Sequence, residues 1–295
     1  MKKNFYITTP IYYVNDKPHI GHAYTTILAD VLSRYNRRIN TETFFLTGLD
    51  EHGQKVQEAA NKLGVDPKKH CDRMAPRFTN LWDKLHISND DFIRTTEERH
   101  KKVVEEILQT VMRNGDIYEA EYEGLYSVSE ERFITEKEAE TGTFRDIKKL
   151  NEKNYFFKMS KYQEQLIEHI KLNKKFIQPT HRKNEILGFL KNPLNDLCIS
   201  RPKSRLNWGI ELPFDKNYVT YVWFDALINY ISAAGYSSNK ILFKKLWPAS
   251  YHLIGKDILT THAVYWPTML MSVAIELPKS IFAHGWWLME ESKMS

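Results

Sequence analysis

The sequence of 295 residues contains only two cysteines, Cys71 and Cys198, which lie far apart. Two isolated thiols exclude a disulfide framework and provide no C-x-x-C pair for zinc, so we expect reduced intracellular thiols. No run of about 18 apolar residues is present, and no signal-peptide segment follows the basic N-terminus. The sequence therefore predicts a cytoplasmic protein with no membrane partner.

Two common phosphate-binding loops are missing as well. No segment matches G-x-x-x-x-G-K-[ST] or G-x-G-x-x-G, so a nucleotide would have to bind in another way. The basic excess is small, with 42 Lys and Arg against 37 Asp and Glu and a net charge of +5. This charge is compatible with a polyanion such as tRNA but does not identify one.

The first fifty residues show the alternation of strand and helix that is typical of an α/β unit. Residues 5–8 read as a strand, apolar side chains then recur at helical spacing from residue 23 to residue 35, and residues 43–47 read as the next strand. A strand, a helix and a strand at this spacing predict a parallel βαβ unit. A further helix is predicted over residues 97–114, with Thr95 and Glu98 as its capping box.

The pattern changes at residue 116, where short segments, many charged residues and scattered turn residues replace the alternation of predicted strands and helices. The α/β pattern resumes with an apolar run at residues 218–224, which is predicted to be a buried parallel strand. Strands are also expected at residues 251–254, before a helix through Trp266, and at residues 280–283.

The predicted fold is a doubly wound parallel α/β sheet, Rossmann-like and split by an inserted domain. Residues 1–115 form the first half of a nucleotide-binding domain, residues 116–217 the insertion, and residues 218–295 the second half.

The segment Pro18-His19-Ile20-Gly21-His22 carries the first candidate site, because it lies at the mouth of a predicted helix. A helix N-terminus offers unpaired N–H groups and the positive end of the dipole, which favours phosphate. Gly21 lets a nucleotide approach the backbone, and the two histidines can donate to phosphate oxygens. Two ordinary surface histidines are the simpler explanation of so short a motif taken alone.

The second candidate segment is Lys293-Met294-Ser295, which follows His284-Gly285. With His19 to His22 it resembles the HIGH and KMSKS signatures of class I aminoacyl-tRNA synthetases. Five longer segments resemble the bacterial-type methionyl-tRNA synthetase family, and they cover residues 6–15, 45–53, 155–163, 221–227 and 252–258. The resemblance extends over essentially the whole chain, in the right order. It implies that methionine is activated with ATP and Mg²⁺ and transferred to tRNA(Met).

The resemblance also implies which residues bind ATP. His19, His22 and Lys293 would be catalytic contacts to the phosphates, and Gly21 would make room for the adenosine. The other implied ATP contacts follow the later strands, and they are Lys256, Asp257, His284 and Gly285.

The implied methionine pocket has a polar anchor and an apolar wall. Asp50 would bind the substrate ammonium by a charge-assisted bond. A thioether sits well against aromatic edges. The remaining implied contacts are Ile11, Tyr13, Trp223, Ala226, Leu227, Tyr230, Ile258 and His262. Without the resemblance, core packing would be the preferred explanation for Trp223 and Tyr230.

The predicted tRNA contact is the acceptor stem, reached by basic residues of the insertion, most of which are better explained as a solvated face. The family motif continues with a second lysine beyond Ser295, so the chain as given is expected to activate methionine poorly or not at all. Its anticodon-reading domain would also follow residue 295.

Three alternatives stay open. The chain could serve leucine, isoleucine, valine or cysteine, it could be a smaller H-x-G-H nucleotidyltransferase, or it could bind methionine and nucleotide without catalysis. Tyr13, Trp223, Tyr230 and His262 favour methionine over the other amino acids, whereas the long insertion disfavours the small nucleotidyltransferase.

We predict that the insertion contains no structural zinc and that the protein has no metal site of its own. Many relatives carry two C-x-x-C pairs there, but the matching positions hold Ser127, Glu130, Glu140 and Thr143, none of which is a thiolate or imidazole. Elemental analysis of the purified chain should find far less than one zinc per molecule. A relative with both cysteine pairs is the positive control, and stoichiometric zinc in this chain would contradict the prediction.

Overall fold

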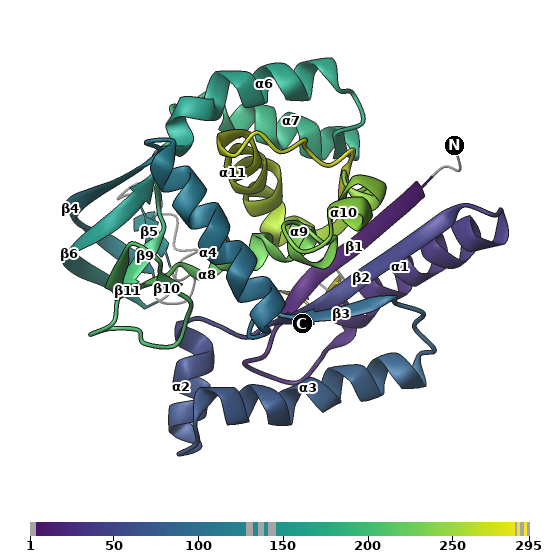
Figure 1. The fold of residues 1–295 in the computed structure, drawn as a ribbon, viewed down its shortest axis with the longest axis horizontal. Coiled ribbons are helices and arrows are strands. Elements are labelled where there is room, and N and C mark those ends of the chain that lie inside the picture. The colour runs from purple at the N-terminus through teal and green to yellow at the C-terminus, as the bar shows by residue number, and fades with distance from the viewer. Residues whose placement is uncertain are drawn as a thin grey trace.

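The computed structural model describes residues 4–127, 132–134, 139–140, 146–286, 288–289 and 292–293. Its centre is a parallel sheet of six strands (Figure 1). In spatial order these are β3 (Asp91–Arg94), β2 (Glu42–Asp50), β1 (Asn4–Tyr13), β12 (Tyr251–Gly255), β13 (Ile281–His284) and β7 (Ile177–Gln178). The chain winds outward in both directions from β1 and β12, so the prediction of a doubly wound sheet is confirmed.

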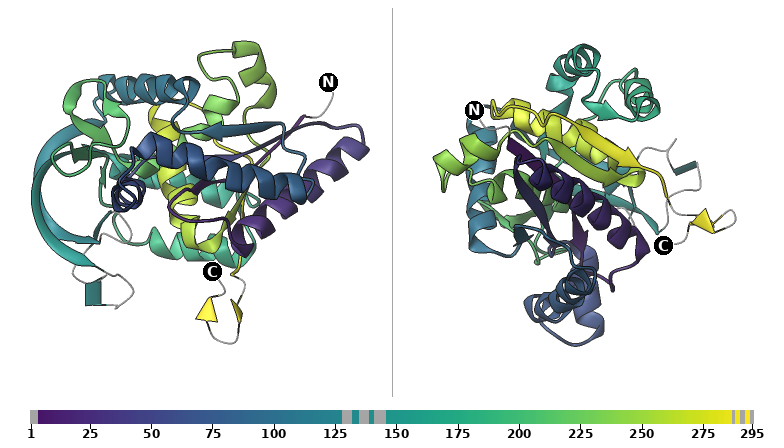
Figure 2. Two further views of the ribbon diagram at one scale, coloured as in Figure 1. Left: turned by 90° about the horizontal axis from the view of Figure 1, so that it is seen from below. Right: turned by 90° about the vertical axis from the view of Figure 1, so that its right-hand side faces the viewer.

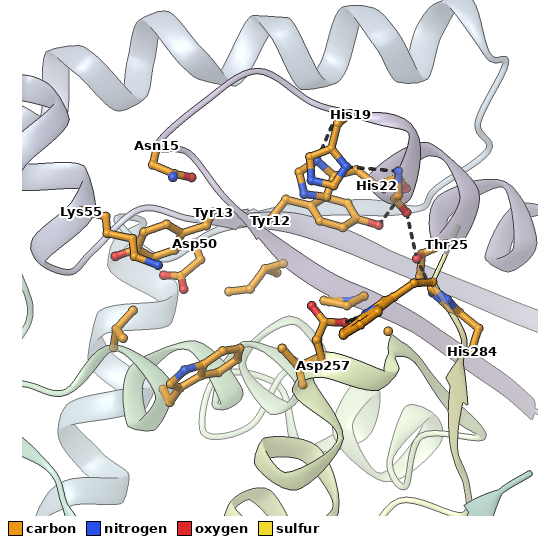
Figure 3. Close-up of a pocket in the computed structure, with 18 of the residues that line it drawn as sticks. Tyr12, Tyr13, Asn15, His19, His22, Thr25, Asp50, Lys55, Asp257 and His284 are labelled. Atoms are coloured by element: carbon orange, nitrogen blue, oxygen red, sulfur yellow. Dashed lines mark hydrogen bonds between the residues drawn. The ribbon is translucent and has the colours of Figure 1, made fainter. Parts of the chain in front are cut away.

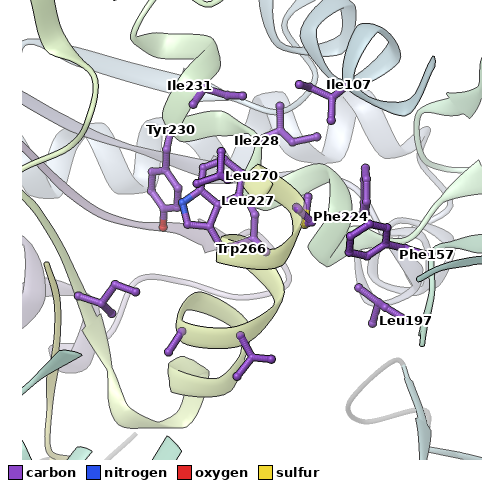
Figure 4. Close-up of a cluster of buried hydrophobic side chains, with 14 of the residues drawn as sticks. Ile107, Phe157, Leu197, Phe224, Leu227, Ile228, Tyr230, Ile231, Trp266 and Leu270 are labelled. Carbon is purple, nitrogen blue, oxygen red and sulfur yellow. The ribbon is translucent and has the colours of Figure 1, made fainter. Parts of the chain in front are cut away.

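Successive side chains of β1 point to opposite faces of this sheet, and each face has its own apolar cluster. Ile7 joins Ala29 of α1 (Ile20–Arg38) on one face. Tyr6 joins the larger cluster on the other face, under α4 (Glu98–Arg113), α9 (Asn229–Ala233) and α11 (Trp266–Ser272). Figure 2 shows the helices on the two sides of the sheet, and Figure 4 shows the aromatic part of the larger cluster around Trp266.

A third cluster covers the loop after β1. It is formed by α2 (Gln54–Lys62) and α3 (Pro67–Lys84), whose apolar stripes enclose Tyr12. The Tyr12 ring stacks on Phe78 with centroids 6.2 Å apart. This packing fixes the loop that leads to α1.

Helix α4 confirms the helix predicted over residues 97–114, and its apolar stripe is buried. The predicted capping box is wrong, however. Glu97 is the N-cap and makes no side-chain cap bond, while the Thr95 hydroxyl accepts a hydrogen bond from the Glu51 backbone N–H at 3.0 Å. Thr95 therefore joins two strand ends instead of capping a helix.

The long hairpin β4 (Ile117–Ser127) and β6 (Ile147–Phe157) dominates the region after α4, with β5 (Arg132–Ile134) and β8 (Leu197–Cys198) at its edges. A second small sheet contains β10 (Glu211–Leu212), β11 (Asp215–Thr220) and β9 (Ser200–Pro202).

Between these sheets lie η1 (Met159–Tyr162), α6 (Gln163–Leu172), β7 and α7 (Thr180–Phe189). Because β7 pairs with β13, part of the predicted insertion joins the central sheet. The boundaries at residues 115 and 217 stay a prediction.

The predicted parallel strand at residues 218–224 is right as a strand only for residues 218–220, and it is wrong in direction and beyond Thr220. Strand β11 ends at Thr220 and is antiparallel to both neighbours, and α8 (Val222–Leu227) begins immediately afterwards. Five of the six α8 residues are buried, so the helix is apolar nearly all round. An apolar run of this length does not distinguish a buried strand from a buried helix.

The predictions for the C-terminal quarter fare better. Strands β12 and β13 are confirmed, and α10 (Lys240–Leu246) precedes them. The helix expected through Trp266 is present in three pieces, a 3-10 turn at Lys256–Ile258, a π-helical turn at Thr261–Tyr265 and α11. None of the helices within the described ranges combines the length and apolar character needed to span a bilayer.

Gly48 of β2 provides a test of this sheet. A Cβ atom there would lie 2.0 Å from the Ile93 carbonyl oxygen of β3, so Gly48→Ala must move backbone. We expect it to lower the free energy of unfolding by about 1–3 kcal/mol, measured by urea denaturation.

The matched control is Gly188→Ala in α7, where a Cβ meets nothing within 4 Å. We expect it to stabilise the fold by up to about 1 kcal/mol. Equal small effects of both substitutions would show that the contact between β2 and β3 is looser than the structure has it.

Candidate active site

A cavity of about 550 Å³ opens at the carboxyl ends of the central strands (Figure 3). Its walls come from the loops after β1, β2, β12 and β13, together with the start of α8. The lining residues are Pro10, Ile11, Tyr12, Tyr13, Asn15, His19, Gly21, His22, Thr25, Asp50, Lys55, Val222, Trp223, Gly255, Asp257, Ile258, His284, Gly285 and Trp286. Eleven of these were predicted as site residues, so residues from both halves of the sequence share one cavity.

His19 and His22 cap α1 in a way that fixes their protons. The Gly21 N–H donates to Nδ1 of His19 at 3.1 Å, and the His19 N–H donates to Nδ1 of His22 at 3.3 Å. Because a backbone N–H can only donate, Nδ1 accepts in both rings, and each neutral ring carries its proton on Nε2. The rings stack with centroids 3.6 Å apart. This end of the cavity therefore offers two imidazole donors beside a helix N-terminus, an arrangement suited to an anion.

His284 joins the end of β13 to the first turns of α1. Its Nδ1 donates to the Gly285 carbonyl at 2.8 Å, its Nε2 lies 2.7 Å from the Thr25 hydroxyl, and its ring meets Tyr24 edge-on. This contact holds the anion end of the cavity against the second half of the sheet.

Asp257 and Trp286 lie on the adjacent wall. The Trp286 indole N–H donates to Asp257 Oδ1 at 3.3 Å. A Cβ atom on Gly255 would lie 2.5 Å from the same carboxylate oxygen, so only glycine leaves that oxygen its place. The predicted ATP contact Lys256 does not line the cavity, and its ammonium lies 3.8 Å above the Trp286 ring instead.

The other end of the cavity is less polar. Ile11, Trp223 and Ile258 line it, together with Tyr13 and the nearly buried Asp50. Figure 3 shows Asp50 beside Tyr13 and Lys55, whose ammonium lies 5.9 Å from the Tyr13 ring centroid. A single carboxylate in a mainly apolar end fits a ligand that carries one ammonium and an apolar side chain.

Four predicted methionine contacts lie behind this wall and do not line the cavity, namely Ala226, Leu227, Tyr230 and His262, all of them buried. His262 Nδ1 donates to the Ile258 carbonyl at 2.9 Å, so its Nε2 is an acceptor and receives the Tyr230 hydroxyl proton at 2.8 Å. The His262 ring meets Trp223 edge-on at 6.2 Å. These side chains support the apolar wall through Trp223.

The histidines behind the wall are uncharged near neutral pH. Burial lowers the pKa of His262 to about 4, although the Ile258 carbonyl acts in the opposite direction. Burial, and secondarily the neighbouring His262, also lowers the pKa of His252 well below its ordinary value. No charge from these rings therefore competes with an apolar ligand.

Sequence reasoning missed eight lining residues, which are Pro10, Tyr12, Asn15, Thr25, Lys55, Val222, Gly255 and Trp286. Helical spacing could have suggested Thr25, which lies one turn after Gly21. Lys55 and Trp286 carried no signal, because their roles depend on how the loops fold back.

For some predicted positions, the side chain or the whole residue lies outside the described part of the chain. The backbone of Lys293 lies in β15 (Ser292–Lys293), which pairs with β14 (Leu288–Met289), but the side chain is outside the described part. Of the four knuckle positions, Ser127 ends β4 and Glu140 is exposed, whereas Glu130 and Thr143 lie outside the described residues. The absence of zinc stays a prediction.

A doubly wound sheet with a cavity at its switch point, flanked by a capped helix N-terminus, defines a nucleotide-binding α/β domain. Within that class, residues 5–144 and 143–295 match the family model described as tRNA synthetases class I (M). The chain belongs to this family.

Named relatives and solved structures agree with this assignment. The chain is 52 % identical to a methionine–tRNA ligase of Fusobacterium nucleatum, over its whole length and 47 % of that protein, and 51 % identical to one of Rickettsia bellii, covering 58 % of it. It thus spans about half the length of these curated relatives. It superimposes on Mycobacterium tuberculosis methionyl-tRNA synthetase in complex with methionyl-adenylate with a TM-score of 0.92, at 43 % identity, covering 96 % of this chain and 57 % of that one.

The buried, neutral His262 predicts a pH dependence of stability. Its folded pKa of about 4 lies below the ordinary 6.5, so its contribution is complete above pH 6.5 and is lost as the pH falls toward 4. The difference corresponds to at most about 3 kcal/mol. His262→Gln removes this titration, so its free energy of unfolding should fall less than that of the wild type between pH 7 and about pH 4.5, measured by urea denaturation. The exposed His181→Gln should behave like the wild type, and an equal loss in His262→Gln would contradict the prediction.

Proposed function

We propose that the switch-point cavity of this chain binds methionine and ATP, the substrates that a methionine–tRNA ligase joins to methionyl-adenylate in its first step. The observation that carries the proposal is the polarity of one cavity of about 550 Å³. One end has the carboxylate of Asp50 beside apolar walls, and the other has the paired imidazole donors of His19 and His22. The bound methionyl-adenylate of the Mycobacterium structure, in a domain with a TM-score of 0.92, supports the same assignment.

In the proposed reaction the methionine carboxylate attacks the α-phosphorus of ATP and pyrophosphate leaves. The chemistry asks the protein mainly to position two substrates and to stabilise phosphate charge. His19 and His22 donate their Nε2 protons to phosphate oxygens, and Gly21 leaves the helix entrance open to the nucleotide. Asp257, His284 and Gly285 face the nucleoside, and Lys256 and Lys293 are proposed as further ATP contacts by family resemblance.

The proposed methionine contacts are of two kinds, one charged contact and several apolar contacts. Asp50 accepts from the substrate ammonium, while Ile11, Tyr13, Trp223 and Ile258 enclose the thioether chain. The buried Ala226, Leu227, Tyr230 and His262 become contacts if Trp223 moves on binding. A hydrophobic pocket discriminates by only about 1–3 kcal/mol per methylene, so selectivity rests partly on the polar pair of Tyr230 and His262.

ATP is proposed to enter as its Mg²⁺ complex. Mg²⁺ usually keeps several of its waters and binds through one or two carboxylates and the substrate phosphates, so it would enter with the nucleotide. The proposed second substrate is tRNA(Met), whose acceptor stem would reach the cavity from the side of the insertion, and the proposed location is the cytoplasm.

Calorimetric titration with methionine, leucine, isoleucine and cysteine tests the proposal, because every described pocket residue is present in this chain. We expect binding of methionine and at least about tenfold weaker binding of the other three. Asp50→Asn should abolish detectable methionine binding, because the ammonium loses its charged partner. The matched control is Asp83→Asn on the exposed face of α3, which should bind as the wild type does. A folded chain that binds none of the four amino acids would refute the proposal.

A further inference from the structure

A buried carboxylate that does not line the cavity connects its two methionine walls. Asp225 of α8 is fully buried and accepts from two histidines that are themselves buried. Its Oδ2 lies 2.6 Å from Nδ1 of His52, and its Oδ1 lies 2.7 Å from Nε2 of His100. Three distant segments, the loop after β2, helix α4 and helix α8, therefore meet at one carboxylate.

Hydrogen bonds hold the His100 ring at both of its nitrogens. Nε2 of His100 donates to the Asp225 carboxylate, because a carboxylate oxygen only accepts. Nδ1 lies 3.1 Å from the Ser232 hydroxyl, which also lies 3.0 Å from the Ile228 carbonyl. The ring of His100 therefore joins Asp225 of α8 to Ser232 of α9.

The electrostatics of Asp225 agree with this pairing. Burial alone would raise the pKa of the carboxyl, but His52 and His100 outweigh it and hold the pKa below its usual range. The carboxylate is thus ionised and accepts from both histidines at once. An unpaired charge at this depth would cost several kcal/mol.

The positions of these residues in the sequence tie the network to the site. His52 stands two residues after Asp50, and Asp225 stands two residues after Trp223, so the bond between them sets the separation of the two walls. His52 also meets the Trp208 ring edge-on at 5.3 Å. His100 and Ser232 fix α8 and α9 to α4 from behind. His19, His22 and Asp257, which line the other parts of the cavity, do not belong to this network.

We propose that Asp225 is a positioning residue for the methionine site, which holds the Trp223 wall opposite Asp50 through its hydrogen bonds to His52 and His100. The inference rests on the proposed function, because it assigns this geometry to methionine. It adds a specificity-determining network that touches neither substrate.

Isothermal titration of the 295-residue chain with methionine and with a non-hydrolysable ATP analogue tests this proposal. Asp225→Asn should weaken methionine binding by at least about tenfold and leave the affinity for the ATP analogue within about twofold. His100→Gln keeps one donor for Asp225 but loses the ring that also contacts Ser232, so it should give a smaller loss in the same direction. If Asp225→Asn does not fold, His100→Gln tests the proposal in its place.

The matched control is Asp116→Asn. Asp116 is another buried carboxylate, bonded to Lys161 and Ser272, and it is not among the residues that line the cavity. It should lower stability as Asp225→Asn does, yet leave both affinities unchanged. If both variants weaken methionine equally, or if Asp225→Asn weakens both ligands equally, Asp225 is merely structural and the proposal fails.

Nuclear magnetic resonance of the chain with ¹⁵N-labelled histidine provides a second readout. The Nε2–H resonance of one histidine, identified by its loss in His100→Gln, should exchange slowly with water and should shift or disappear in Asp225→Asn. An unchanged resonance in Asp225→Asn would overturn the bond between His100 and Asp225. If the folded wild type binds no methionine, the proposed function fails and this inference with it. If the wild type binds and Asp225→Asn binds as tightly, only the inference fails.

Discussion

Strands β1 and β12 pair in parallel at the centre of the sheet, with Ile7 opposite Tyr251 and Thr8 opposite His252. The same seam includes the bond from the Tyr6 N–H to the Ser250 hydroxyl, across 244 positions of sequence. Connections leave these two strands in opposite directions, so space remains above their carboxyl ends. Every wall of the cavity depends on this pairing, because His19 and Asp50 come from one half and Asp257 and His284 from the other. Bringing such distant segments together costs loop-closure entropy. The long hairpin of β4 and β6 folds through local pairs and shortens the effective loop.

Histidine performs three different tasks around this seam, and its hydrogen-bond partners decide which. Backbone donors at the start of α1 leave His19 and His22 with the proton on Nε2, where it can meet an anion. The Ile258 carbonyl places the proton of His262 on Nδ1 and makes Nε2 an acceptor. The Asp225 carboxylate requires a proton on Nε2 of His100. One side chain type thus donates toward the cavity, accepts a buried hydroxyl proton and donates to a buried carboxylate within one domain.

Features that depend on local contacts could be predicted from the sequence, whereas features that depend on distant contacts could not. The parallel strands, the helix of residues 97–114 and the entry of α1 were predictable, because periodicity and motif lie within a few residues of each other. The apolar run at residues 218–224 was misread, because a helix buried on all sides has the composition of a buried strand. Thr95 was misread because its partner, the Glu51 N–H, is 44 positions away.

The candidate site divides in the same way. Eleven lining residues were named by family resemblance, but Lys55, Thr25 and Trp286 were missed, because only the folded loops place them at the cavity. The role of Asp225 was not predicted, for a different reason. It stands inside a segment used for the resemblance, yet its role depends on His52 and His100, which are 173 and 125 positions away. Networks of buried polar groups are the part of a site that single-sequence patterns describe least.

The segment Lys158-Met159-Ser160-Lys161 shows why a motif needs its structural context. It has the first four letters of the family's second signature, but its side chains are committed elsewhere. Lys158 donates to the Gly115 carbonyl at 2.8 Å, the Ser160 hydroxyl donates to Asp196 at 2.6 Å, and Lys161 pairs with the buried Asp116 at 2.6 Å. These bonds join the end of α4 to the start of α6. By contrast, Lys293 follows β13, the strand whose end forms a wall of the cavity. Position relative to the sheet, and not the letters, is therefore the ground for proposing the second segment and not the first as a nucleotide contact.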